Sequence, residues 1–197
     1  MQNHVANIVE QDRLLETLKT DFPTATVMDR REKPSHGYRA VHLIAEVANK
    51  PVEIQIRTSL QQLWAALSEK ASDVLDPAIK YGHGPEIWQG ILLKTSKVVA
   101  SHEGLERLHF RAESAGAEAL SALVELRKTI TAYLALEPPG PLAREGQQQL
   151  IASDKETAAI EVALEQKRKD LVYDRGKIMA VLKLLGTVLE KRKGKGS

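Results

Sequence analysis

The sequence predicts a mixed α/β (α+β) domain that is followed by a long antiparallel helical hairpin. Proline positions give the first indication: five prolines fall within residues 1–85, none falls within 86–137, and three follow at 138, 139 and 141. Because a proline inside a helix costs about 3 kcal/mol, the proline-free stretches permit long helices. Strand-like alternation before residue 58 and seven-residue apolar repeats after residue 104 support the same division.

The composition excludes several classes of site. The chain has 197 residues and no cysteine, which excludes disulfide bonds, thiolate metal sites and a cysteine nucleophile. Its length fits one domain, or a small domain with an appendage. The sequence has neither an apolar run long enough to span a bilayer nor the pattern of a signal peptide. We therefore expect a cytoplasmic protein without a membrane partner.

The basic character of the chain is concentrated at its C-terminal end. Residues 191–197 carry four basic side chains and no acidic one, whereas the net charge of the whole chain is +2. The charge of the remainder is therefore slightly negative and indicates no basic folded surface. A solvated terminus is one interpretation of this tail, and contact with nucleic acid is the other.

The first predicted elements are a helix and a short strand. Residues 10–21 have helical spacing, with one apolar side and one charged side. Residues 24–28 are rich in β-prone side chains, and a polar loop follows at 29–37. The apolar side of the helix consists of Leu14, Leu15 and Leu18.

A β-hairpin is predicted after this loop. Residues 38–47 and 52–57 alternate apolar and polar side chains, and the turn residues 48–51 separate them. Pairing Val47 with Val52 places the apolar residues on one face, whereas a slip by one residue would mix the two faces. The opposite face then presents Tyr38, His42, Glu53, Gln55 and Arg57.

This polar face has two interpretations. One side of an antiparallel sheet is often solvated and needs no function. Against that, the predicted register sets Glu46 beside Glu53, a like-charge pair that is unfavourable unless a cation neutralises it. Glutamate and glutamine are also disfavoured in strands. Tyr38 beside basic side chains such as Arg57 and Lys33 suits a nucleotide base and its phosphates.

A well-marked helix is predicted from Thr58 onward. Thr58-x-x-Gln61 can form a capping box at its start. The apolar stripe that follows would cover the apolar side of the hairpin, so that Trp64 lies in the core. This stripe consists of Leu60, Leu63, Trp64, Leu67, Ala71, Val74 and Leu75.

Two long antiparallel helices are predicted at 86–136 and 154–192. Their apolar residues recur every seven positions, as in a coiled-coil seam, and the short loop at 137–141 makes them neighbours. Ser153-x-x-Glu156 has the pattern of a capping box that opens the second helix. We expect this hairpin to serve packing or oligomerisation, and hence a homo-oligomer. The two series are Leu105, Ala112, Ala119, Leu126 and Tyr133, and Leu164, Leu171, Ile178 and Leu185.

Two separated motifs resemble the synthetase domain of the RelA/SpoT alarmone synthetases. They are Gly37-Tyr38-Arg39-Ala40-Val41-His42 and Val52-Glu53-Ile54-Gln55-Ile56-Arg57-Thr58, with Gln62-Leu63-Trp64-Ala65 downstream. Their order, their spacing and the strand–turn–strand–helix context match over about residues 8–82. The resemblance implies a nucleotidyltransferase-like fold, in which helices flank a mixed sheet.

The resemblance also implies an activity. Members of that family transfer pyrophosphate from ATP to the 3′-hydroxyl of GTP or GDP and require Mg²⁺. Carried over to this sequence, Tyr38 stacks on the acceptor guanine, and Glu53 is the catalytic residue and Mg²⁺ ligand beside the 3′-hydroxyl. The residues that would line the acceptor or its phosphates are Lys33, Arg39, His42, Gln55 and Arg57.

The chain departs from the family pattern at two places. Residues 1–9 contain no Asp, Gly or Arg, whereas family members have a basic ATP-binding segment and a Mg²⁺-binding Asp before this point. We therefore expect 1–82 to be an N-terminally truncated acceptor half, and 83–197 a helical extension. Such a chain would make little alarmone alone and would use ATP only if the missing lobe were supplied. Ser68-Glu69-Lys70 also replaces the Glu-His pair that is common in the family after the Trp.

Two other functions stay open from the sequence. The helical hairpin could be the working part of a non-catalytic oligomerisation or docking module. Some family members pyrophosphorylate the 3′ end of tRNA as toxins, and the basic tail is the feature that hints at a relative of that kind.

Overall fold

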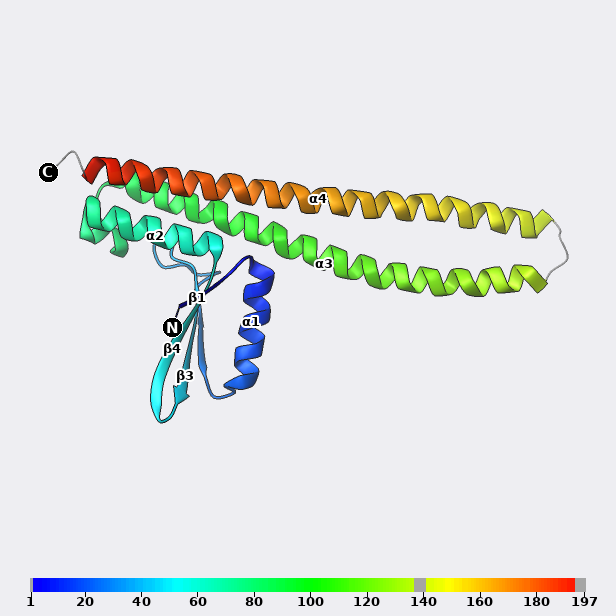
Figure 1. The fold of residues 1–197 in the computed structure, drawn as a ribbon, viewed down its shortest axis with the longest axis horizontal. Helices are drawn as coiled ribbons and strands as arrows, with labels where there is room; N and C mark the ends of the chain where they lie inside the picture. Colours follow the sequence, from blue (N-terminus) through cyan, green and yellow to red (C-terminus); the bar gives the residue numbers. More distant parts are fainter. Residues whose placement is uncertain (1, 137–140, 194–197) are drawn as a thin grey trace. The chain divides into compact units, whose positions relative to one another are not determined.

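The computed structural model describes residues 2–136 and 141–193 (Figure 1). The first elements are β1 (Gln2–Val5), α1 (Ile8–Asp21), β2 (Thr26–Asp29), β3 (Val41–Val47) and β4 (Lys50–Thr58). Helix α2 (Ser59–Val74), the 3₁₀ helix η1 (Pro77–Tyr81) and the long helices α3 (Glu86–Leu136) and α4 (Pro141–Lys193) follow. The predicted α+β fold class is confirmed. Residues 137–140 of the predicted loop and 194–197 of the basic tail lie outside the described residues.

The chain divides into two compact units. The first comprises the described residues up to Arg107 and those from Leu171 onward, so it holds the sheet, α1, α2, η1 and one end of each long helix. The second is Leu108–Asp170, in which α3 and α4 run side by side in opposite directions (Figure 1). Across the described part of the chain, we find no helical stretch that combines the length and the apolarity of a membrane span.

The four strands form one mixed sheet in the order β1-β4-β3-β2. Strand β1 runs parallel to β4, and the other two pairs of neighbours are antiparallel. Val47 of β3 lies opposite Lys50 of β4. The predicted register, with Val47 opposite Val52, is therefore wrong by two residues.

The turn between β3 and β4 explains this shift. Ala48 and Asn49 have φ angles of 50° and 58°. Two successive positive φ angles are typical of a two-residue type I′ turn, which matches the twist of the strands. The turn therefore takes two residues instead of the predicted four. Because two residues are one full period of a strand, the predicted faces are still correct. Glu46 lies opposite Pro51, so the predicted like-charge pair with Glu53 does not form.

The apolar face of the sheet packs against α1 and not, as predicted, against the stripe of α2. Helix α1 begins after Asn7, whose side chain accepts a hydrogen bond from the Glu10 amide at 2.9 Å. Capping of this kind satisfies a backbone donor that has no partner inside the helix. The buried residues of this first core are Leu15, Val41, Leu43, Ala45, Ile54 and Ile56.

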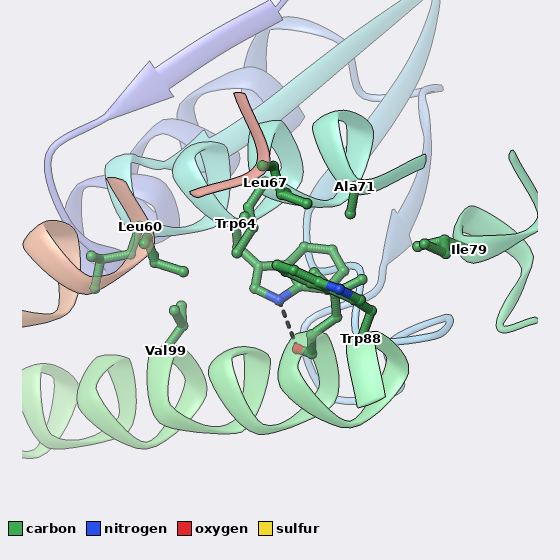
Figure 2. Packing of buried hydrophobic residues seen from close by; sticks show 10 residues of the cluster. Leu60, Trp64, Leu67, Ala71, Ile79, Trp88 and Val99 are labelled. Carbon is green, nitrogen blue, oxygen red and sulfur yellow. Dashed lines mark hydrogen bonds between the residues drawn. The ribbon is translucent and has the colours of Figure 1, made fainter. Parts of the chain in front are cut away.

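The apolar stripe of α2 forms a second core with the parts of α3 and α4 that belong to the first unit (Figure 2). The predicted capping box is present, because Thr58 and Gln61 exchange hydrogen bonds. Trp64 is 4% exposed, and its indole nitrogen donates to the Leu92 carbonyl at 2.8 Å. The prediction that Trp64 is a core residue is confirmed. The second core also includes Leu60, Leu67, Ala71, Ile79, Trp88, Val99, Leu182 and Leu189.

Helix α4 begins earlier than predicted. Its first residue is Pro141, so the predicted start at 154 with a capping box at Ser153 is wrong, and Ser153 lies inside the helix. Proline suits the first turn of a helix, because its ring presets φ and its missing N–H would have no partner there. The predicted antiparallel arrangement is confirmed in the second unit, where Gly116 of α3 lies next to Leu164 of α4.

Candidate functional site

Five polar side chains predicted to share one face of the sheet lie together. His42 Nδ1 is 2.5 Å from Glu53 Oε1, and the Tyr38 hydroxyl is 3.1 Å from His42 Nε2. Arg57 donates to the Tyr38 hydroxyl at 2.8 Å and to Gln55 Oε1 at 2.9 Å. Gln55 lies directly opposite His42 in the β3–β4 pair. We call Tyr38, His42, Glu53, Gln55 and Arg57 the polar cluster.

Tyr38 reaches the polar cluster from the loop before β3. Ser35 and Tyr38 form an isolated β-bridge, and Gly37 between them has a φ of 91°. A Cβ atom at Gly37 would lie 2.8 Å from the ring of Trp64, so this position requires glycine for space as well as conformation. The hydroxyl of Ser96 also donates to the Gly37 carbonyl at 2.6 Å. The loop is thus held against α2 and α3, and the position of Tyr38 follows from it.

The guanidinium of Arg57 is engaged within the protein. Besides its bonds to Tyr38 and Gln55, it donates to Gln62 Oε1 of α2 at 2.9 Å. Its central carbon lies 5.3 Å from the centre of the Tyr38 ring, a position in which the ring attracts a cation. Gln62 was not among the predicted site residues. Arg57 therefore orients Tyr38 between the sheet and α2.

Glu53 and His42 form an acid–base pair at the edge of the cluster. The hydrogen bond with His42 is the main cause that lowers the pKa of Glu53. The Glu53 side chain is 47% exposed, so its carboxylate stays accessible from solvent. The bond to Nδ1 fixes the orientation of the imidazole and leaves Nε2 facing the Tyr38 hydroxyl. Such a pair can take up a proton from a hydroxyl group that is placed beside it.

A pocket of about 390 Å³ opens beside the polar cluster. Tyr38, Arg57 and Gln62 line one part of it. Pockets of this size hold small organic ligands. The remainder is lined by side chains from the Tyr38 loop, α2 and η1, among them His36, Ala65, Ala66, Ser68, Glu69 and Lys80.

Lys33 and Arg39 are the two predicted site residues that the polar cluster does not include. Lys33 is exposed in the loop between β2 and β3. Arg39 is half-buried and lines, with Gln61 and Val99, a small hollow that has no room for a water molecule. Burial lowers the pKa of Arg39, and the charge of Glu103 opposes that effect. Arg39 therefore lies near Val99 and Glu103 of α3.

A buried polar junction between α2 and α3 is absent from the sequence prediction. Glu103 is 3% exposed and accepts hydrogen bonds from the Thr58 hydroxyl at 2.6 Å and from Gln61 Nε2 at 3.0 Å. Gln61 also exchanges hydrogen bonds with Gln11 of α1. Burial raises the pKa of Glu103, although the bonds from Thr58 and Gln61 act in the opposite direction. A polar Gln61 next to an apolar stripe is the sequence signal that could have indicated this junction.

A cluster of ion pairs connects α1 and the start of the Tyr38 loop to α3. Arg31 lies 2.5 Å from carboxylate oxygens of Asp12 and Asp29, and Arg107 lies 2.7 Å from Asp12. Burial raises the pKa of both carboxyl groups, but the arginine hydrogen bonds outweigh it and lower the pKa. These ion pairs hold the first residues of the loop that leads to Tyr38.

Replacing Glu103 with glutamine should change how stability depends on pH. Because the pKa of Glu103 is raised in the folded state, its favourable contribution is complete below the unfolded value near 4.5. That contribution is lost as pH rises through the raised pKa. The free energy of unfolding of Glu103→Gln, measured in urea from pH 4.5 to 8, should therefore fall less with pH than that of the unchanged protein.

Glu106, one turn along α3, provides a matched control of opposite sign. Burial raises its pKa, but hydrogen bonds from His102 and Arg175 outweigh burial and lower it. Its contribution is present at neutral pH and is lost on acidification, so Glu106→Gln should be most destabilising near pH 7. Parallel pH profiles for Glu103→Gln and Glu106→Gln would contradict both assignments.

The polar cluster does not form a Mg²⁺ site by itself. Glu53 is its one carboxylate, and that group is already bonded to His42. Within residues 2–136 and 141–193, three or more His, Asp or Glu side chains nowhere gather as metal ligands would. Mg²⁺ needs near-octahedral oxygen ligands, usually carboxylates together with substrate phosphates. The assignment of Glu53 as a Mg²⁺ ligand therefore stays a prediction, and no step below is routed through the metal.

Comparison with known proteins gives partial similarities. No protein-family model matches the chain. The uncharacterized proteins Rv1366 of Mycobacterium tuberculosis (strain H37Rv) and Mb1401 of Mycobacterium bovis are each 40% identical over 79 residues, which are 39% of this chain and 29% of theirs. The chain thus spans less than a third of the length of these curated relatives.

Solved structures of alarmone synthetases are also similar to this chain. Small alarmone synthetase 1 from Bacillus subtilis is 24% identical, with a TM-score of 0.40 over 58% of this chain and 62% of that one. A GTP pyrophosphokinase family protein from Streptococcus pneumoniae is 19% identical, with a TM-score of 0.41 over 60% of this chain and 61% of that one.

Proposed function

We propose that this chain binds a guanine nucleotide in the pocket beside the polar cluster, as the acceptor site of a RelA/SpoT-type alarmone synthetase. The observation that carries the proposal is the joining of Tyr38, His42, Glu53 and Arg57 by hydrogen bonds. Two of the four, Tyr38 and Arg57, line a ligand-sized pocket. All four residues belong to the two motifs that resemble that family.

The parts of the polar cluster suit the parts of a nucleotide. The Tyr38 ring offers a stacking surface for a base, and Arg57 holds the ring from one side. The ribose then lies toward His42 and Glu53. In a pyrophosphate transfer from ATP, the 3′-oxygen would attack the β-phosphorus and its proton would pass to the His42–Glu53 pair. The bond between that phosphorus and the α,β-bridging oxygen would break, and AMP would leave. We assign no ATP-binding residues within this chain, so the proposal concerns the acceptor.

Calorimetric titration of the purified chain tests this proposal. GDP and GTP should bind with one site per chain, in EDTA as well as in Mg²⁺, because the base contacts named here need no metal. ADP and ATP should bind more weakly. Absence of measurable GDP and GTP binding at millimolar concentration, or equal binding of ADP, would contradict it.

The second unit favours a second function, self-association through the helical hairpin. Its two helices leave large apolar side chains exposed, and a groove of about 320 Å³ lies between them. Leu123 and Ile160 line this groove and are 45% and 60% exposed. A hairpin from a second copy would cover such residues, as in a four-helix bundle.

Light scattering on the full chain tests self-association. The unchanged protein should have the mass of a dimer or a larger oligomer, and a Leu123→Glu/Ile160→Glu double variant should have a smaller mass. Binding of GDP should be the same in both, because the two residues are far along the chain from the polar cluster. A monomer at the highest soluble concentration would exclude this function.

A further inference from the structure

The pocket beside the polar cluster has a floor made by one stripe of α2. Gln62, Ala65, Ala66 and Glu69 are four of the six α2 residues that line it, and their spacing of three and four residues places them on one side of the helix. The other two are Trp64 and Ser68. The stripe is polar at both ends and carries only methyl groups in the middle. At 1.5 Å per residue, its two polar ends are about 10 Å apart along the helix axis.

The two ends of the stripe have different surroundings. Gln62 accepts a hydrogen bond from Arg57, so its end belongs to the polar cluster. Glu69, at the other end, forms an ion pair with Lys80 of η1, and both residues line the pocket. The Glu69 side chain is 61% exposed, so its carboxylate has acceptor capacity beyond the one bond to Lys80.

The charges at the Glu69 end favour a neutral hydrogen-bond donor over a phosphate. The ammonium of Lys80 is already matched by the Glu69 carboxylate, so the pair offers a phosphate no net attraction. A carboxylate accepts hydrogen bonds and donates none when ionised. The ligand group at this end should therefore present N–H donors, and the phosphates should lie away from it.

We propose that Glu69 binds the N1–H and the 2-amino group of a guanine base, and that this contact selects guanine over adenine and hypoxanthine. The inference rests on the proposed function, because it names the base read by that same pocket. Guanine presents two adjacent donors on this edge, which a carboxylate can accept in parallel. Adenine presents an unprotonated N1, whose lone pair would face the carboxylate. Hypoxanthine keeps N1–H but lacks the amino group.

This assignment agrees with the orientation of the nucleotide proposed above. With the base edge at Glu69, the base passes over Ala65 and Ala66 and meets the Tyr38 ring. The ribose then lies beyond Tyr38, on the side of His42 and Glu53. In this arrangement Glu69 of the helix stripe contacts the edge of the base, and the Tyr38 ring stacks on its plane. The His42–Glu53 pair lies beside the 3′-hydroxyl.

Titrations of the full chain with GDP, IDP and ADP test the role of Glu69. The unchanged protein should bind GDP about tenfold or more tighter than IDP, since IDP lacks one charge-assisted hydrogen bond. Glu69→Ala should lower GDP affinity by at least that factor and bring the GDP-to-IDP ratio near one. Glu69 is exposed, so this variant should fold, which circular dichroism checks.

Two further variants separate the carboxylate from its neighbourhood. Asp73→Ala, on the same helix but outside the pocket lining, should leave the GDP-to-IDP ratio unchanged. Lys80→Met removes the partner of Glu69 but keeps the carboxylate, so the preference for GDP should persist. Loss of the preference in Lys80→Met with retention in Glu69→Ala would overturn the inference.

The failure of this inference differs from that of the proposed function. If the unchanged protein binds GDP, and a Tyr38→Ala change weakens that binding, but the GDP-to-IDP ratio is the same in Glu69→Ala, then the assignment of Glu69 is wrong and the proposed function stands. If the unchanged protein binds no guanine nucleotide, both are overturned.

Discussion

Replacing Trp64 with alanine should lower the free energy of unfolding by about 3–5 kcal/mol, the range observed for large aromatic residues in cores. Trp64 is 4% exposed and packs with Leu60, Leu67 and Trp88 between α2 and α3 (Figure 2). Its indole nitrogen donates to the Leu92 carbonyl, which would lose a buried partner. Urea denaturation followed by circular dichroism measures the change.

A Trp64→Phe variant is the matched control. It keeps an aromatic ring in the core but removes the hydrogen bond to Leu92, so its loss of stability should be clearly smaller than that of Trp64→Ala. Because the Trp64 ring also lies against Gly37, the alanine variant should in addition bind GDP more weakly through a loosened Tyr38 loop. A loss below about 1 kcal/mol in Trp64→Ala would contradict the described core.

Replacing Tyr38 with alanine should weaken GDP binding by about 1–3 kcal/mol, roughly 5- to 150-fold in the dissociation constant. The change removes the aromatic surface on which the base is proposed to stack. It also removes the hydroxyl that bonds to His42 and Arg57, so the imidazole loses one of its two side-chain contacts. Calorimetric titration with GDP gives the affinity directly.

Tyr38→Phe separates the ring from the hydroxyl. It retains the stacking surface and should bind GDP within a few fold of the unchanged protein. Its free energy of unfolding should also stay close to that of the unchanged protein, because Tyr38 is only partly buried. Equal affinities for GDP in Tyr38→Ala and the unchanged protein would exclude Tyr38 as the base-stacking residue.

The sequence was sufficient to place five of the seven predicted site residues together, and the reason is strand parity. Side chains two apart along a strand share a face, so His42, Glu53 and Arg57 lie on the same face in any register that keeps the apolar face intact. The register itself depends on whether Ala48 and Asn49 adopt positive φ angles. Alanine gives no signal of that conformation, and so the turn was predicted two residues too long.

The partner of each apolar surface could not be predicted in the same way. An amphipathic stripe shows that a helix buries one side, but not which element covers it. The stripe of α2 therefore correctly predicted that Trp64 is a core residue. The prediction that the stripe packs against the β-hairpin was wrong, because it packs against α3 and α4. Buried polar contacts are harder still, because Glu103 meets Gln61 across 42 positions of the chain and neither has a periodic signature. Arg39 belongs to the same motif as Tyr38, but of these two residues only Tyr38 lines the pocket, so the role of Arg39 in the site stays a prediction.

The bonding of Arg57 has a consequence for the thermodynamics of recognition. Its guanidinium contacts Tyr38, Gln55 and Gln62 before any ligand arrives, so the aromatic ring has lost its rotamer freedom during folding. Ordering a side chain at the moment of association would cost about 0.5–1.5 kcal/mol of affinity. The proposed nucleotide would therefore meet a tyrosine that is already ordered, and its association should be fast, with little rearrangement of this side chain.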